Sequence, residues 1–184
     1  MHRREVMGGS IWCEVPELGL VEFPPAIQRH FQHYQQTGKK DKEAGGQLFW
    51  KYADDGHILV GAITGPRPTD KRSRTGYKAD HKQEQLEIDH FYGEGLYLLG
   101  DWHTHPEPVA SPSSLDVVAI QQIYRSSKNP GPGFLLAIVG TRPLEEGLSL
   151  SWCNDRVVPI ALVGAAGSKA YRIWCGQTMP TLSP

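Results

Sequence analysis

A short apolar run, residues 96–102, leads directly into His103, Thr104 and His105 and is closed by Pro106. The length of this run, with glycine before it and proline after it, favours a buried β-strand over a helix. On a strand, side chains two residues apart point to the same face, about 6.6 Å apart along the chain. The two imidazoles can therefore reach one metal ion from a single strand.

The segment that follows supplies a third possible ligand. Ten residues separate His105 from Asp116, and Ser113 stands three positions before that aspartate. The serines and the proline of residues 111–116 predict the start of a helix. Two histidines and one carboxylate leave the fourth position of a tetrahedral zinc ion open for water, which is typical of catalytic and not of structural sites.

Each of these features has a simpler interpretation when it is taken alone. An H-x-H pair on a strand is common, Ser113 and Asp116 can form only a helix capping box, and the upstream Glu43 can be a surface carboxylate. The combination at this spacing favours a metal site. The H-x-H sites of metallo-β-lactamases fit less well, because an Asp-His pair follows there and Pro106 and Glu107 follow here.

Together these residues resemble the JAMM metalloproteases, the catalytically competent branch of the MPN/JAB domains. The family pattern is a glutamate, an H-x-H pair, seven residues, a serine, two residues and an aspartate, and the similarity covers roughly residues 10–160. The resemblance implies a single α/β domain with a mixed β-sheet flanked by helices, like that of cytidine deaminases. The pattern is met by Glu43, His103, His105, Ser113 and Asp116.

The resemblance also implies a role for each of these residues. His103, His105 and Asp116 would bind Zn²⁺, which lowers the pKa of its bound water from about 15.7 towards neutrality. Glu43 would act first as general base and then as general acid. The Ser113 hydroxyl would donate a hydrogen bond to the oxyanion that forms during amide hydrolysis.

Two neighbouring features each leave two interpretations open. Asp101 shares a strand face with both histidines, and it either orients an imidazole or makes an ordinary structural hydrogen bond. The polar, basic loop of residues 65–78 carries Arg67, Arg72 and Arg74, which either bind an acidic feature of the substrate or belong to a solvated loop tip. The solvated loop is slightly favoured.

The expected substrate follows from the resemblance as well. JAMM enzymes usually hydrolyse an amide or isopeptide bond after the C-terminal glycine of ubiquitin or a ubiquitin-like protein. This chain is similar to the JAB peptidases of CBASS antiphage operons, which release a conjugate from the C-terminus of a nucleotidyltransferase-type cyclic-oligonucleotide synthase (CD-NTase). An E1/E2-like ligase is then the expected partner. The alternatives are a peptidase that matures a ubiquitin-like sulfur-carrier protein and a non-catalytic MPN scaffold, although scaffold members usually lack one or more ligands.

Composition gives no reason to expect a nucleic-acid or membrane partner. The net charge of the 184 residues is −1, so there is no excess of positive charge that would attract nucleic acid or an anionic membrane. No apolar stretch approaches the ~20 residues of a transmembrane helix, and the N-terminus has no apolar core of a secretory signal. Three scattered cysteines without a C-x-x-C pair indicate reduced thiols and a cytoplasmic protein.

Periodicity and turn residues predict an alternation of strands and helices. The helix after Ser113 is expected to pack on the sheet through Leu115, Val118, Ala119 and Ile123. Strands are expected near 10–22 (with a turn at Pro16), 46–52, 57–63, 96–102, 134–139, 148–153 and 157–163, and helices near 25–38, 80–91 and 113–127.

The expected domain organisation is simple. Residues 1–9 are predicted to be a flexible N-terminus and 10–163 the JAB/MPN domain. Residues 164–184 are predicted to form a linker and tail, in which 171–174 form either an added strand or a docking element and 179–184 are disordered.

Overall fold

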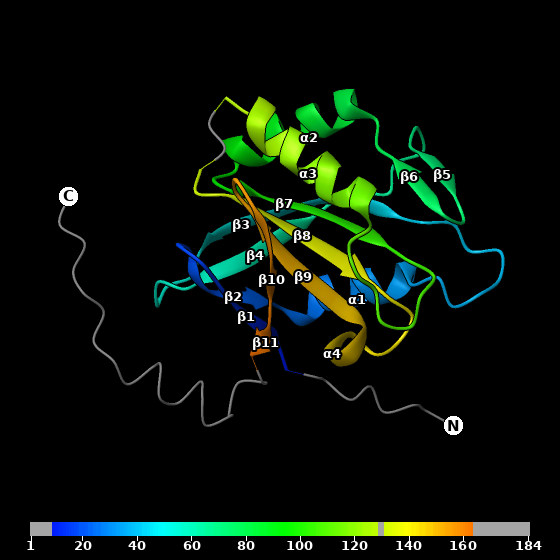
Figure 1. Ribbon diagram of the computed structural model, residues 1–184. Helices are drawn as coiled ribbons and strands as arrows, with labels where there is room; N and C mark the ends of the chain where they lie inside the picture. The colour runs from blue at the N-terminus through cyan, green and yellow to red at the C-terminus, as the bar shows by residue number, and fades with distance from the viewer. Residues whose placement is uncertain (1–8, 129–130, 164–184) are drawn as a thin grey trace, which may run out of the picture.

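A nine-stranded mixed sheet forms the centre of the computed structural model, which describes residues 9–128 and 131–163 (Figure 1). The strand order is β10-β9-β8-β7-β3-β4-β2-β1-β11; β7 runs parallel to β8 and β2 parallel to β4, and the other neighbours are antiparallel. The α/β fold with a mixed sheet is therefore confirmed. The strands are β1 (Ile11–Val15), β2 (Gly19–Phe23), β3 (Gly45–Tyr52), β4 (Ile58–Ile63), β7 (Tyr97–Thr104), β8 (Phe134–Val139), β9 (Leu148–Cys153), β10 (Val157–Ile160) and β11 (Leu162–Val163).

Helices cover both faces of this sheet. α1 (Pro25–Tyr34) lies on one face, and α2 (His81–Gly93) and α3 (Ser114–Ser126) lie on the other (Figure 1). The expected sheet flanked by helices is thus confirmed. α1 ends at Tyr34 and not at the expected Gly38, so a longer loop leads into β3. The short α4 (Leu144–Gly147) joins β8 to β9.

The apolar face of α3 differs from the prediction. Of the four residues expected to pack on the sheet, only Ile123 does so, whereas Leu115 is 79% exposed and Val118 is 49% exposed. The buried residue is Ile120, which packs with Leu136 and other residues of β8. This follows from helix geometry. Asp116 faces His103 and His105, and Ile120 and Ile123, four and seven positions later, lie on the same face of the helix as Asp116.

Two other segments differ from their predicted form. The loop of residues 65–78 contains a two-stranded hairpin, β5 (Lys71–Ser73) and β6 (Gly76–Lys78). The single strand expected over 157–163 is divided: β10 pairs with β9 at one edge of the sheet, and β11 pairs with β1 at the other. The chain therefore links the two edges of the sheet within a few residues.

Some expectations fall partly or wholly outside the described residues. The predicted features of 1–8, 171–174 and 179–184 lie there, as does Cys175; the two described cysteines, Cys13 and Cys153, are buried and free. Among the residues that the structure describes, no helix is long and apolar enough to cross a membrane.

Glycines at the start of β3 allow other segments to lie directly against it. A Cβ atom at Gly46 would be 2.0 Å from the carbonyl oxygen of Thr64, and one at Gly45 would be 2.6 Å from the ring of Tyr77. Only glycine fits such contacts. The turn at Thr64 and the β5–β6 hairpin are therefore held against β3, immediately after Glu43.

Candidate metal centre

β7 places both histidines on the face of the sheet that α2 and α3 cover. His103 is paired with Gly45 of β3 and Ile138 of β8, so neighbouring strands on both sides fix its backbone. The backbone N–H of His105 donates to the carbonyl of Val139 at 3.0 Å, which keeps the chain extended beyond the end of β7. The two Nε2 atoms lie 3.1 Å apart. The convergence expected from their spacing is present.

The first turn of α3 brings Asp116 to the same point. Ser113 is the N-cap: its hydroxyl oxygen accepts from the Asp116 N–H at 3.2 Å, and its own N–H donates to Asp116 Oδ2 at 2.7 Å. This is the capping box of the simpler interpretation. The other carboxylate oxygen, Oδ1, lies 3.2 Å from His103 Nε2, and Oδ2 lies 3.5 Å from His105 Nε2. The aspartate therefore both caps the helix and faces the histidines.

These three side chains have the geometry of a tetrahedral metal site. Their ligand atoms all lie within 4.8 Å of one another. Zinc bonds of about 2.0–2.1 Å at tetrahedral angles place neighbouring ligand atoms about 3.3 Å apart. The two Nε2 atoms, 3.1 Å apart, and Asp116 Oδ1, 3.2 Å from His103 Nε2, lie close to that value, and the other carboxylate oxygen, Oδ2, lies 3.5 Å from His105 Nε2. The group is thus suited to hold one metal ion with a position left open.

Protonation in this cluster favours metal binding. Burial alone would raise the pKa of Asp116, but the hydrogen bond and charge of His103 and the bonds from Ser113 outweigh it and hold that pKa below its usual value. Burial lowers the pKa of His105, helped by the neighbouring His103. An ionised carboxylate and a neutral imidazole are the forms that bind metal ions.

Glu43 lies beside this cluster and is buried, with 7% of its surface exposed, so the surface-carboxylate interpretation is wrong. Its neighbour Ala44 is fixed to the ligand strand: the Ala44 N–H donates to Thr104 Oγ1 at 3.0 Å, and the Thr104 N–H donates to the Ala44 carbonyl at 2.8 Å. Burial raises the pKa of Glu43 to about 7, with His103 opposing and Asp116 adding to the increase. A carboxyl group with that pKa can accept and return a proton near neutral pH.

The cluster opens into a cavity of about 540 Å³. Ser113 lines it with a hydroxyl group that also hydrogen-bonds with Asp116. The walls come from β6, α2 and α3: Lys78, His81 and Glu84 are polar, and Leu115, Ala119 and Ile123 are apolar.

Neither role expected for Asp101 is seen. Asp101 lines the cavity, but its side chain makes no hydrogen bond within the described part of the chain. Burial raises its pKa to about 7, with Glu84 adding to the increase and Arg67 opposing it.

A different carboxylate, that of Glu107, lies near the second ring nitrogen of His105. It is 3.6 Å from Nδ1, the nitrogen that does not face Asp116. Sequence reasoning missed Glu107, whose only signal is its position two residues after a ligand.

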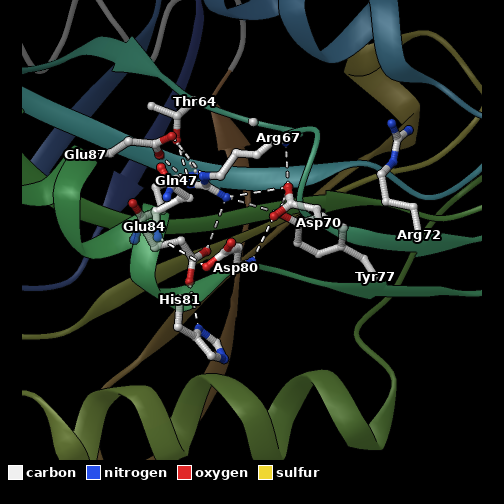
Figure 2. Close-up of polar contacts among 12 residues, drawn as sticks. Gln47, Thr64, Arg67, Asp70, Arg72, Tyr77, Asp80, His81, Glu84 and Glu87 are labelled. Carbon is white, nitrogen blue, oxygen red and sulfur yellow. Dashed lines mark hydrogen bonds and ion pairs between the residues drawn. The ribbon is translucent and has the colours of Figure 1, made fainter.

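All three arginines of the basic loop bind other parts of this chain. Arg67 is buried, which contradicts a solvated position for it, whereas Arg74 is exposed, as expected of a solvated loop. Substrate binding by this loop stays a prediction. Arg67 is buried and bonds Glu87 with both arms of its guanidinium, at 2.8 Å for the Nε–Oε1 contact. Figure 2 shows the polar contacts around Arg67, with Arg72 turned away from them. Arg72 bonds the carbonyls of residues 42 and 43, and Arg74 those of residues 38 and 39.

Sequence reasoning also missed Thr104, the residue between the two histidines. It is fully buried, and its hydroxyl accepts from Ala44 and donates to Gln36 at 3.1 Å. Strand alternation gave the available signal: a residue between two ligands must point to the opposite face, and a polar residue buried there needs hydrogen-bond partners.

Comparison with known proteins agrees with this site. The chain matches the family model described as prokaryotic homologs of the JAB domain over residues 25–154. A CD-NTase/cGAS isopeptidase of Escherichia coli (strain TW11681) is 31% identical over 87 residues, covering 46% of this chain and only 55% of that protein. A protein of Pseudomonas aeruginosa with the same name is 28% identical over 73% of this chain and 86% of its own length. Probable metalloprotease y4qB of Sinorhizobium fredii is 28% identical over 62% of this chain and 72% of its own length. This chain belongs to the prokaryotic homologs of the JAB domain.

Proposed function

We propose that the chain is a zinc-dependent isopeptidase that acts on a CD-NTase-type protein conjugated through its C-terminus. The observation that carries the proposal is the convergence of His103, His105 and Asp116 beside the buried Glu43. The relatives named CD-NTase/cGAS isopeptidase support the substrate class. The bond to be cleaved would be one made by an E1/E2-type ligase, which we place in the same pathway.

In this proposal, a zinc ion held by His103, His105 and Asp116 would lower the pKa of its water and polarise the scissile carbonyl. Glu43 takes a proton from the attacking water and delivers it to the leaving amine. Its pKa of about 7 suits both steps. Ser113 donates its hydroxyl hydrogen to the carbonyl oxygen as negative charge develops there.

The cavity suits an extended chain terminus. It runs from the metal centre between β6 and α2 on one side and α3 on the other. The exposed Leu115 offers apolar contact close to Ser113. An extended peptide in such a groove is recognised largely through its backbone, and a narrow groove favours small residues next to the cleaved bond.

The test uses the full chain loaded with zinc and a fusion in which a fluorescent protein follows the C-terminal residue of a CD-NTase. We expect cleavage at the junction, located by mass spectrometry, and cleavage at least about 100-fold slower by the Glu43→Gln variant, which should still bind zinc. A zinc-loaded protein that leaves this fusion intact contradicts the proposal. Cleavage of a ubiquitin-like carrier-protein precursor in its place would assign the alternative peptidase function.

A further inference from the structure

The backbone of Glu43 is held by two adjacent residues of the β5–β6 hairpin. The Glu43 N–H donates to the Ser73 carbonyl at 2.8 Å, and the Glu43 carbonyl accepts from Arg72 Nε at 2.5 Å. Arg72 Nη2 also donates to the Lys42 carbonyl at 3.2 Å. Both polar backbone groups of Glu43 are therefore bound by a segment that lies about thirty residues further along the chain.

The Arg72 guanidinium is itself fixed in place. It points away from the ion pairs around Arg67 (Figure 2) and lies over the ring of Tyr34, the last residue of α1, with its central carbon 6.0 Å from the ring centre. It thus joins the hairpin, the loop before β3 and the end of α1. A planar guanidinium can donate to two carbonyls at once in a fixed orientation, which a lysine ammonium cannot reproduce.

We propose that Arg72 is a positioning residue for Glu43: it fixes the Lys42 and Glu43 carbonyls and thereby aims the Glu43 carboxyl group at the metal centre. This inference rests on the proposed function. Ala44, the next residue, is anchored separately through Thr104. Loss of Arg72 therefore removes the donor from the carbonyl groups on either side of the Glu43 side chain, while the anchoring of Ala44 to β7 remains. Misplacement of a reacting group by about 1 Å can reduce a rate about 100-fold.

The same hairpin supplies a matched control. Arg74 donates to the carbonyls of Gly38 and Lys39, both at 3.0 Å, in the same loop but farther from Glu43. Arg72→Ala and Arg74→Ala each remove one arginine that bonds two carbonyls of this loop. A general loosening of the loop would affect both variants alike, whereas positioning of Glu43 would affect the first alone.

The kinetic test compares Arg72→Ala, Arg72→Lys and Arg74→Ala as zinc-loaded full chains on the CD-NTase fusion. We expect Arg72→Ala to lower kcat about tenfold or more with KM and zinc content unchanged, and Arg72→Lys to recover only part of the loss. Arg74→Ala should stay within about twofold of the unmodified chain. In a Glu43→Gln background, Arg72→Ala should not change the residual rate, because the group that it aims is already gone. Equal losses for the two alanine variants, or an undiminished Arg72 effect without Glu43, would overturn the inference.

A readout independent of activity is amide hydrogen exchange in the metal-free protein. Arg72→Ala should speed exchange of the Glu43 N–H about tenfold, with Ala44 and the global stability unchanged, and Arg74→Ala should not. If the unmodified chain cleaves no fusion, the proposed function fails and this exchange experiment still decides the role of Arg72. If the unmodified chain is active but the Glu43 N–H exchanges at the same rate in Arg72→Ala and Arg74→Ala, the proposed role of Arg72 is wrong and the proposed function stands.

Discussion

Asp116 divides its two carboxylate oxygens between the helix that carries it and the imidazole that it faces. Oδ2 accepts the Ser113 N–H at 2.7 Å, and Oδ1 lies 3.2 Å from His103 Nε2. The bond that closes the first turn of α3 therefore also sets the direction of the proposed ligand. This explains how a residue on a short helical turn can meet side chains from a distant strand at bonding distance.

Asparagine at this position should separate the two roles. Asp116→Asn keeps an oxygen that can cap the helix but removes the charge that would bind the metal. We expect zinc affinity to fall by more than about 100-fold, beyond the cost of losing a supporting partner alone. Asp116→Ala should in addition lower the metal-free unfolding free energy by about 1 kcal/mol. Chelator competition and urea unfolding in EDTA measure the two effects. Normal zinc affinity in the asparagine variant would remove Asp116 from the ligand set.

The ion pairs of Arg67 should be a main source of stability for the wall formed by α2. Arg67 is buried beside Glu87, with Glu84 at 3.6 Å and Asp70 at 3.7 Å from Nη1. Removal of one partner from a buried charge network costs about 3 kcal/mol or more, because the remaining charges lose their partner. We therefore expect Arg67→Ala to lower the urea unfolding free energy by about that amount and Arg74→Ala by less than about 1 kcal/mol. Equal stability of the two variants would contradict this account.

α3 offers a pair of apolar residues that both line the cavity but differ in burial. Ile120 is 2% exposed and packs on β8, whereas Leu115 is 79% exposed. Ile120→Ala should reduce stability by about 2–5 kcal/mol through lost burial and a new void. Leu115→Ala should change it by less than about 0.5 kcal/mol and should raise KM for the fusion substrate. Thermal unfolding and steady-state kinetics test this, and a large stability loss at Leu115 would show that α3 is rotated.

Acid should weaken the N-terminus of α2 through Asp80. A hydrogen bond from Thr69 and the N–H groups of Gln83 and Lys82 hold the pKa of this N-cap carboxyl below its usual value. A lowered folded-state pKa means that the stabilisation is complete above the unfolded value of about 3.9 and is lost as pH falls through the folded value. Asparagine caps a helix without titrating. We therefore expect the stability advantage of the unmodified chain over Asp80→Asn to shrink as the pH falls below about 4 in urea titrations. Parallel pH curves for the two proteins would exclude this contribution.

Sequence periodicity predicts much of this arrangement and fails where long-range contacts decide. His103 and His105 share a face because strand alternation is local, and the Ser113 cap is readable because its partner is three residues away. The β5–β6 hairpin could not be predicted, because its residues show no apolar pattern. It is held by contacts to β3 and to the loop before β3. Likewise, Leu115 and Ile120 are both apolar and at helical spacing, and only the direction of Asp116 decides which of them is buried.

The role of Arg72 shows the same limit in a functional residue. A basic loop beside a catalytic site suggests contact with substrate, but the acceptors that bind Arg72 are backbone carbonyls of this chain. Backbone acceptors have no sequence signature, so no pattern of residue types could identify them. Only the folded arrangement of the hairpin against residues 42 and 43 reveals them.

His103, His105 and Asp116 are proposed to hold a single zinc ion. The most direct measurement is a zinc titration of chelator-stripped full chain, followed by native mass spectrometry. We predict one tightly bound zinc ion per chain, and loss of that ion in His105→Ala while the chain stays folded. A folded, stripped protein that takes up no stoichiometric zinc, or a His105→Ala variant that still binds one ion as tightly, would contradict the account.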